Sequence, residues 1–241
     1  MKTKKIELYI HIPFCKSKCR YCDFCSFQAE NAVIDDYITK LKEELIFWGK
    51  KLTKEEVVTV FIGGGTPSYL KEQYIKEICN VIFQYFKVSE NAEITIEANP
   101  GTVDLKKLCT YRESGINRIS FGLQSTIQEE LQYLGRIHTY EQFLQCYNWA
   151  REAGFCNISV DLMSAIPKQT IHSYEKNLRT IAELSPEHIS AYSLIIEEGT
   201  PFYEDENLED LLPSEEDEVR MYQMTAQILK EYGYEQYEIS N

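Results

Sequence analysis

The chain has no apolar run long enough to span a membrane, and its start does not follow the pattern of a secretory leader. The first residues, Met1-Lys-Thr-Lys-Lys5, are basic, but Glu7 interrupts the short apolar stretch that follows them. These absences exclude an integral membrane protein and disfavour a secreted one. We therefore expect a cytoplasmic protein with no transmembrane segment.

Basic residues are scarce as well. The 25 Lys and Arg residues face 38 Asp and Glu residues, which gives a formal net charge of −13 at pH 7. This balance argues against a nucleic-acid-binding surface, because such surfaces need clustered Lys and Arg. The stretch from Glu204 to Glu218 holds nine acidic residues and no basic one. We expect a solvated loop and then a helix that Ser214 caps, and we assign the stretch no functional role.

Cysteine, by contrast, is abundant, and three of the eight cysteines lie in one short segment. It reads His11-Ile-Pro-Phe-Cys15-Lys-Ser-Lys-Cys19-Arg-Tyr-Cys22, which is a C-x3-C-x2-C spacing. Three thiolates can hold a four-iron cluster and leave one iron open to a small molecule. A disulfide framework is disfavoured in a chain without a secretory leader. Structural zinc remains an alternative, because Cys25 would complete a set of four thiolates.

The remaining cysteines and the histidines carry less information. We expect the four cysteines that are scattered along the chain to be small buried hydrophobic residues, namely Cys79, Cys109, Cys146 and Cys156. His11 belongs to the cysteine segment and is expected to position it. The other histidines, His138, His172 and His188, are expected at the surface or at helix ends.

Apolar periodicity predicts strands that alternate with helices. The expected strands cover residues 6–12, 57–62, 93–98, 117–122, 157–163 and 188–195, with a short last strand at 235–239. The expected helices cover residues 33–48, 73–86, 104–113, 129–134, 140–153, 171–184 and 215–232. Such alternation implies parallel pairing with right-handed crossovers. We predict an α/β fold, a partial barrel of six strand–helix units with its site at the carboxyl ends of the strands.

Glycines and carboxylates follow the expected strands at those ends. Gly63-Gly64-Gly65-Thr66-Pro67 comes after the second strand, and its glycines would let the backbone approach a ligand closely. It has neither the G-K-[ST] ending of a phosphate-binding P-loop nor the G-x-G-x-x-G spacing of a dinucleotide site. Glu97 and Asp161 stand at the ends of the third and fifth strands. A carboxylate in such an apolar setting is costly unless it is paired or solvated.

Two further polar residues complete the pattern. Gln124 follows the fourth strand, and Arg136 lies beyond it in Tyr133-Leu-Gly-Arg136-Ile-His138. A guanidinium binds a carboxylate ligand through two parallel hydrogen bonds. We expect these side chains, with Glu97 and Asp161, to surround the mouth that holds the cysteine segment. This convergence argues against structural zinc, which requires none of them.

The cysteine segment, with Tyr21 before its last cysteine, and the Gly-Gly-Gly-Thr-Pro segment resemble the radical S-adenosylmethionine (SAM) superfamily. The resemblance implies that Cys15, Cys19 and Cys22 ligate a [4Fe-4S] cluster whose open iron binds SAM. It also implies SAM contacts at Tyr9, Gly64, Gly65, Thr66, Glu97, Gln124, Arg136 and Asp161, with the main chain near Ile195 as a further candidate.

Five segments in order along the chain resemble one family within it, the oxygen-independent coproporphyrinogen III oxidases with their heme chaperone branch, HemW. They are Tyr9-Ile-His-Ile-Pro-Phe-Cys15, Gly63-Gly-Gly-Thr-Pro67, Ile96-Glu-Ala-Asn-Pro100, Arg118-Ile-Ser-Phe-Gly-Leu-Gln124 and Tyr237-Glu-Ile-Ser-Asn241. The oxidases carry another cysteine two residues after the third ligand. Here that residue is Phe24, as in the HemW branch.

The resemblance therefore implies a heme chaperone that binds heme and delivers it to recipient proteins, with an electron donor as a further partner. The alternative is an oxidase that decarboxylates the propionates of a porphyrinogen by means of an adenosyl radical. For that reaction Arg20 and Arg118 are the candidate cationic partners of the propionates.

The resemblance also bears on domain organisation. We expect residues 1–200 to form the barrel core. Residues 201–241 would form an acidic loop, a helix and a strand that lead toward a C-terminal domain, which the resemblance implies and this chain lacks. The heme-ligating motif of the HemW branch would lie in that part, so no heme ligand is assigned here.

Overall fold

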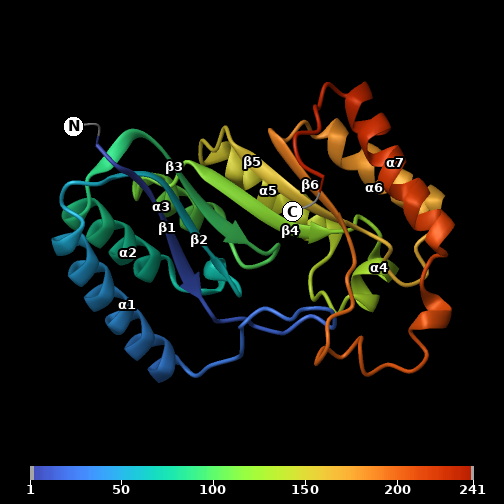
Figure 1. Ribbon diagram of the computed structural model, residues 1–241, viewed down its shortest axis with the longest axis horizontal. Helices are drawn as coiled ribbons and strands as arrows, with labels where there is room; N and C mark the ends of the chain where they lie inside the picture. Colours follow the sequence, from blue (N-terminus) through green and yellow to red (C-terminus); the bar gives the residue numbers. More distant parts are fainter. Residues whose placement is uncertain (1–2, 240–241) are drawn as a thin grey trace. The chain divides into compact units, whose positions relative to one another are not determined.

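The computed structural model describes residues 3–239, in which strands and helices alternate along the chain (Figure 1). The strands are β1 (Lys5–Ile12), β2 (Glu56–Gly64), β3 (Val88–Ala98), β4 (Arg118–Gln124), β5 (Ile158–Ser164) and β6 (His188–Ser193). The helices are α1 (Asn31–Lys51), α2 (Glu72–Tyr85), α3 (Leu105–Glu113), α4 (Gln128–Tyr133), α5 (Tyr140–Glu152), α6 (Ile171–Glu183) and α7 (Glu215–Glu231). Two short 3₁₀ turns, η1 (Pro67–Tyr69) and η2 (Glu209–Leu211), complete the list.

The strands follow one another in the sheet in the order of the chain, β1-β2-β3-β4-β5-β6. The pairs β1–β2, β2–β3 and β5–β6 are parallel. Each parallel step is made by a crossover that contains at least one helix, as parallel pairing requires. The predicted α/β fold of six strand–helix units is therefore confirmed. In the described part of the chain, no helix is both long enough and apolar enough to cross a membrane.

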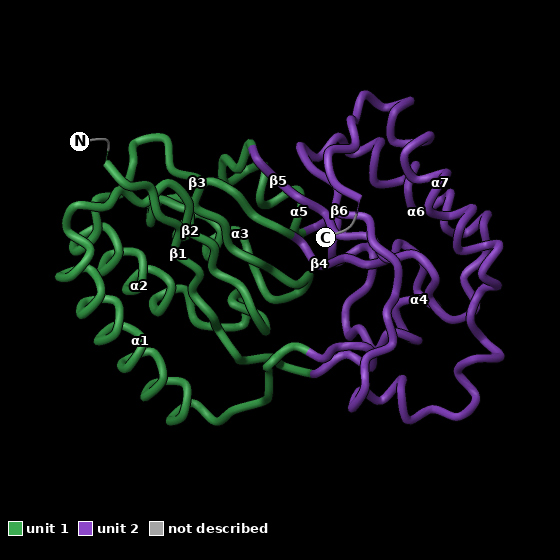
Figure 2. The backbone as a smooth tube through the Cα atoms, in the orientation of Figure 1, with its two compact units in different colours: residues 1–17, 24–120, 146–156 green, residues 18–23, 121–145, 157–241 purple. Residues whose placement is uncertain are grey.

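The described chain divides into two compact units (Figure 2). The first contains residues 3–17, 24–120 and 146–156, and so includes β1 to β3 with α1 to α3. The second contains residues 18–23, 121–145 and 157–239, and so includes β5, β6, α4, α6 and α7. The boundary passes through the cysteine segment, through β4 and through α5.

The core of the first unit is formed by apolar strand residues and one stripe of α2. Ile12, Ile62 and Ile96, from three neighbouring strands, are completely buried. Ile75 and Ile78 of α2 are buried as well, three residues apart on one helix face. The continuous apolar run of residues 57–62 predicted the strand that contains Ile62, because a parallel sheet is covered by helices.

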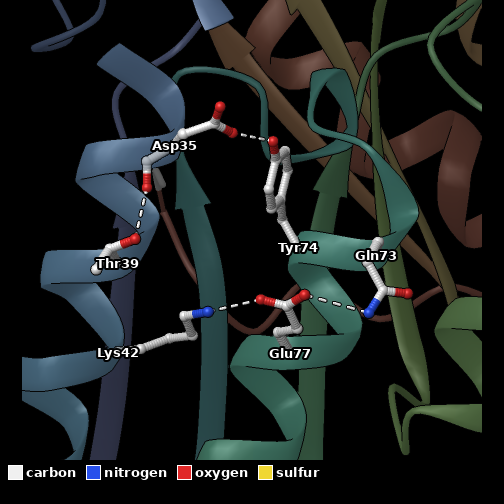
Figure 3. A network of polar contacts seen from close by, with 6 residues as sticks. All are labelled: Asp35, Thr39, Lys42, Gln73, Tyr74 and Glu77. Atoms are coloured by element: carbon white, nitrogen blue, oxygen red, sulfur yellow. Dashed lines mark hydrogen bonds and ion pairs between the residues drawn. The ribbon is translucent and has the colours of Figure 1, made fainter. Parts of the chain in front are cut away.

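Polar side chains link α1 and α2 (Figure 3). Lys42 of α1 donates to Glu77 of α2 over 2.6 Å, and Gln73 donates to the other oxygen of Glu77 over 3.2 Å. The Tyr74 hydroxyl donates to the Asp35 carboxylate. Partly exposed contacts of this kind are each worth about 1 kcal/mol or less, so we assign them a modest contribution to stability.

The second unit has its own apolar cluster, which joins the end of α4, the end of β5 and the loop after β6. Leu134, Met163, Ile166, Phe202 and Leu208 form its most buried part. The helix that follows this loop begins as predicted. The Ser214 side chain accepts a hydrogen bond from the Asp217 amide over 3.2 Å, and four acidic residues lie in the first turn of α7.

One predicted strand is absent from the described residues. Residues 235–239 have no strand conformation, and side chains hold the segment around them. The Tyr234 hydroxyl donates to the Pro186 carbonyl over 2.6 Å, and the Tyr237 hydroxyl lies 2.7 Å from His188 Nε2. Residues 233–239 border a cavity of about 440 Å³ together with β6 and α7. A strand needs a main-chain ladder with a neighbouring strand, and these residues do not form one.

None of the eight cysteines, which all lie in the described part of the chain, forms a disulfide. Cys79 and Cys146 are buried as expected, and burial raises the pKa of the Cys79 thiol to about 12. The same expectation is wrong for Cys156, which is exposed, and for Cys109, which is half-buried. Phe155, the residue before Cys156, is buried in the segment that leads into β5, while Cys156 itself is exposed.

Candidate functional site

The predicted site residues are divided between the two units. The cysteine segment itself passes from one unit to the other. The set in the first unit is Tyr9, Cys15, Gly64, Gly65, Thr66 and Glu97, and the set in the second is Cys19, Cys22, Gln124, Arg136 and Asp161. Among residues 3–239, no group of three His, Cys, Asp or Glu side chains is arranged to hold a metal ion. The assignment of the three cysteines as cluster ligands therefore stays a prediction.

Cys15 is held in a buried, polar setting directly after β1. Its amide donates to the Phe27 carbonyl over 3.0 Å, and its Sγ lies 3.4 Å from the Thr66 hydroxyl. Asn99 Nδ2 donates to the same hydroxyl oxygen over 2.9 Å, which leaves the Thr66 proton available for the sulfur. Sequence reasoning missed Asn99, although it stands two residues after Glu97 in the Glu-Ala-Asn-Pro motif.

The glycines after β2 are required by geometry. A Cβ at Gly65 would lie 3.0 Å from Cys15 Sγ and 2.9 Å from the Phe14 carbonyl oxygen. Gly64 has φ = +116°, which side chains disfavour, and its amide donates to Glu97 Oε2 over 3.0 Å. The Gly-Gly-Gly-Thr-Pro segment therefore packs its main chain against the first cysteine, and its predicted approach to a ligand stays a prediction.

Tyr9 and His11 of β1 connect through polar contacts to the main chain of Cys25, three residues after the last predicted cluster ligand. The Tyr9 hydroxyl lies 3.0 Å from His11 Nδ1, and His11 Nε2 lies 3.0 Å from the Cys25 carbonyl oxygen. The Tyr9 ring stacks on Phe61 and is 60% exposed. Partial burial, and then the charge of Glu97, raises the pKa of Tyr9. His11 thus positions the segment, as expected.

In the second unit, Arg20 holds the middle of the cysteine segment. Its amide donates to the Leu134 carbonyl and its carbonyl accepts from the Phe202 amide, each over 3.0 Å. Its guanidinium donates to Asp205 over 2.7 Å and lies over the Phe202 ring, 4.8 Å from the centroid. Arg20 is therefore already engaged with a carboxylate, which argues against a role toward a propionate. Asp205 gives the acidic stretch a structural contact that sequence reasoning did not foresee.

Arg136 lies beside the second cysteine. Its Nη1 donates to Cys19 Sγ over 3.4 Å, and its Nη2 donates to the Gly122 carbonyl. Tyr21 is half-buried nearby, and burial raises its pKa, with Arg136 opposing and Asp161 reinforcing the shift. Arg136 and Asp161, two predicted SAM contacts distant in the sequence, thus act on the same part of the cysteine segment.

Gln124 ends β4 in an unusual conformation. Its φ of 74° lies in the left-handed region, which costs a non-glycine residue about 1 kcal/mol or more. The Tyr192 hydroxyl donates to its Oε1 over 2.8 Å. Tyr192 was not among the predicted site residues, because its position in β6 carries no sequence signal for a partner in β4.

His138 was expected near the surface, but only 2% of it is exposed. Its Nε2 lies 3.2 Å from the Leu123 carbonyl oxygen. The chain turns back after α4 at Gly135, which has φ = +72°, and this turn brings His138 inside. Burial, and then the positive charge of Arg136, lowers the pKa of His138 to about 3.

This shift predicts a pH dependence of stability. The unfolded chain protonates His138 near pH 6.5, whereas the folded chain resists protonation down to about pH 3. The stability that neutral His138 contributes is therefore complete above about pH 6.5 and is lost as the pH falls, by up to about 1.4 kcal/mol per pH unit. His138→Gln should reduce this loss, measured by urea unfolding across that range, whereas the exposed His172→Gln should not. Equal slopes in both variants would contradict the assignment.

The donor set suits a sulfur-ligated cluster. Two of the three predicted cluster cysteines have a donor at sulfur, Thr66 at Cys15 and Arg136 at Cys19. Hydrogen bonds to the sulfur of a ligating cysteine are among the interactions by which a protein tunes an iron–sulfur cluster. Gly65 keeps the space next to Cys15 Sγ clear of any side chain. The residues present therefore fit an iron–sulfur cluster.

A family model described as the radical SAM superfamily matches residues 9–181, well over half of the chain. The chain belongs to the radical SAM superfamily. Membership implies a [4Fe-4S] cluster and SAM as cofactors, as the cysteine spacing indicated. The radical SAM match begins at Tyr9 and so includes all three cysteines and all eight predicted SAM contacts.

The relatives that the chain matches include heme chaperones and a coproporphyrinogen oxidase. The heme chaperone HemW of Bacillus subtilis (strain 168) is 40% identical over 235 residues, which cover 97% of this chain and 62% of that protein. HemW of Escherichia coli (strain K12) is 37% identical over 241 residues, covering 100% and 63%. The solved structure of coproporphyrinogen III oxidase (HemN) from Escherichia coli, a radical SAM enzyme, is 29% identical with a TM-score of 0.88, covering 97% of this chain and 54% of that one.

The chain therefore spans about three fifths of the length of the curated relatives it matches. The resemblance that the five motifs indicated, to coproporphyrinogen oxidases and their HemW branch, is confirmed by these comparisons.

Proposed function

We propose that this chain is the radical SAM part of a cytoplasmic heme chaperone of the HemW type. It would hold a [4Fe-4S] cluster and SAM, bind heme and deliver it to recipient proteins. The observation that carries the proposal is Phe24, which stands where the oxidases have an additional cysteine and whose side chain is 62% exposed. The HemW relatives, at 36–40% identity over nearly the whole chain, support the same assignment.

The residues that would hold the cofactors follow from the site. Cys15, Cys19 and Cys22 would ligate the cluster, and Thr66 and Arg136 would stabilise two of the thiolates. When bound, the cluster supplies the electron that can cleave SAM reductively. We do not assign Cys25 as a fourth ligand. Its side chain is exposed, and its carbonyl oxygen lies 3.0 Å from His11 Nε2.

SAM would be recognised through its charged groups and its ribose. Arg136 is the cation suited to the carboxylate, because its guanidinium offers paired donors. Glu97 and Asp161 are the carboxylates suited to the amino group or the ribose hydroxyls. The Gly64 and Gly65 main chain would approach the ligand most closely, while Tyr9, Thr66 and Gln124 complete the proposed set.

The domain division remains part of this proposal. We place the barrel core at residues 1–200, and we assign residues 201–241 to a connection toward the further length that the relatives possess. Asp205, which binds Arg20, would fasten this connection to the cysteine segment.

The alternative function is that of an oxygen-independent coproporphyrinogen III oxidase, which the likeness to HemN favours. It needs cations for the substrate propionates. Arg20 is engaged by Asp205, whereas Arg118 donates only a long hydrogen bond of 3.4 Å to the Thr95 hydroxyl. Arg118 is the first residue of β4, at the opposite end of that strand from the predicted site residue Gln124, so neither arginine is well placed for the propionates.

One anaerobic experiment separates the two functions. The cluster-loaded protein, produced together with the further length that the relatives possess, is incubated with coproporphyrinogen III, SAM and a strong reductant, and the porphyrins are analysed by mass spectrometry. In parallel, hemin is added and its absorption spectrum is followed. We expect heme binding and no decarboxylated product. A mass loss that matches decarboxylation, together with 5′-deoxyadenosine, would overturn the chaperone proposal.

A further inference from the structure

The segment after Gln124 is held by a buried carboxylate, Glu130, that has no place in the predicted site. Only 4% of Glu130 is exposed, and its Oε2 accepts three hydrogen bonds. The donors are the Ser125 hydroxyl at 2.6 Å, Asn177 Nδ2 at 2.8 Å and Gln169 Nε2 at 3.0 Å. None of these donors is charged. A carboxylate buried among neutral groups is costly, so its presence calls for a reason beyond packing.

Glu130 determines how the buried Asn177 amide is oriented. An ionised carboxylate can only accept, so the Asn177 Nδ2 must face it. The Asn177 Oδ1 is then directed to the next turn of chain, where it accepts from the Thr126 amide over 2.8 Å and from the Thr126 hydroxyl over 2.5 Å. The reverse orientation of Asn177 would set oxygen against oxygen at Glu130 and would break the contacts with Thr126.

The same carboxylate fixes Ser125. The Ser125 hydroxyl gives its proton to Glu130, and its oxygen then accepts from the Ile127 amide over 2.9 Å. Glu130 therefore determines the conformation of Ser125 and, through Asn177, of Thr126. These are the two residues that directly follow Gln124 in the chain.

Gln124 needs such support because its own backbone is strained. With φ at 74° it occupies a region that a glutamine adopts only when its surroundings impose it. Tyr192 holds the Gln124 side chain from one side, and the backbone after Gln124 is held at the Thr126 amide by Asn177 and at the Ile127 amide by Ser125. The Glu130 network supplies that constraint.

We propose that Glu130 is a positioning residue for SAM. It acts through Ser125 and Asn177 to hold Gln124 in the conformation that meets the ligand. The inference rests on the proposed function, because Gln124 is there a SAM contact. Glu130 itself is buried behind the turn and would not touch SAM.

The test is a double-mutant comparison in cluster-loaded protein, with SAM affinity measured by calorimetry. Glu130→Gln keeps the size of the side chain and one acceptor oxygen, but it removes the charge on which the three donors converge and adds an amide NH₂ group whose hydrogens must find acceptors inside a buried site. We expect it to weaken SAM binding roughly tenfold in the parent protein. In a Gln124→Ala background, the same change should have little further effect, because the two residues act as one unit.

Controls separate positioning from a general loss of structure. Glu129→Gln removes the same charge from the neighbouring, exposed position of α4 and should leave SAM affinity unchanged. Iron content and the spectrum of the reduced cluster without SAM should be normal in Glu130→Gln, while the spectral change caused by SAM should be diminished. Should Glu130→Gln fail to fold, Ser125→Ala removes one link of the network, and we expect a smaller loss of SAM affinity from it.

Two results would overturn the inference. One is a SAM affinity equal to that of the parent protein in Glu130→Gln, or in Ser125→Ala if Glu130→Gln does not fold. The other is a tenfold loss that is the same in both backgrounds, which would make Glu130 independent of Gln124. A parent protein that holds its cluster but binds no SAM would instead refute the proposed function.

Discussion

Cys19→Ala is expected to abolish the cluster. The change removes one of the three thiolates of the C-x3-C-x2-C segment, and we assign no other cysteine of the described chain as a ligand. Two remaining thiolates cannot retain a four-iron cluster. Protein purified without oxygen should therefore lose its brown colour, with iron and sulfide close to zero.

Cys25→Ala is the matched control for this result. It deletes a thiol three residues after Cys22 in the same segment, and the main-chain contact from His11 to residue 25 does not involve the side chain. Iron and sulfide should stay at the parent level. Full iron and sulfide in Cys19→Ala would refute the ligand assignment, and loss of both in Cys25→Ala would revive the four-thiolate zinc or iron alternative.

Arg136→Ala should greatly weaken SAM binding while the cluster remains. Hydrogen bonds to a charged group are worth about 1.5–3 kcal/mol, which corresponds to a loss of about tenfold to a hundredfold in affinity. The variant also removes the donors to Cys19 Sγ and to the Gly122 carbonyl, but all three cysteines stay. Calorimetry with SAM measures the affinity, and iron analysis verifies the cluster.

Arg220→Ala provides the comparison, because this exposed arginine pairs only with Glu216 one helical turn away. The SAM affinity of the Arg220→Ala variant should match that of the parent protein. An unchanged affinity in Arg136→Ala would remove the guanidinium from the SAM site. Loss of iron in Arg136→Ala would instead indicate that Arg136 chiefly supports Cys19, whose sulfur its guanidinium contacts in the structure.

The fold was predictable because its signals are local. Apolar runs marked the strands, and the helix cap at Ser214 is present where the sequence placed it. Boundaries were off where a strand continues into polar residues, as at the start of β3, which begins at Val88 instead of Glu93. Residues 235–239 show the opposite error. Polar and apolar residues alternate there, but the main chain forms no hydrogen-bonded ladder with a neighbouring strand.

The site was predictable only in part, since chemistry at a distance leaves little trace in one sequence. Cysteine spacing and glycine runs are local, so Cys15 and Gly65 were found. Glu130 follows another glutamate in a short helix, and nothing nearby distinguishes the buried one from the exposed one. His138 was misplaced for a related reason, because its burial depends on the turn at Gly135 and not on its neighbours' polarity.

The different exposure of the cysteines has a practical consequence. An alkylating reagent should modify Cys25 and Cys156 readily, because both are exposed, and should spare Cys79, whose thiol is buried and has a pKa of about 12. Those thiols serve as internal standards in a peptide map. Any cysteine whose modification appears only after iron has been chelated away must then have been a ligand, so occupancy can be counted by mass without spectroscopy.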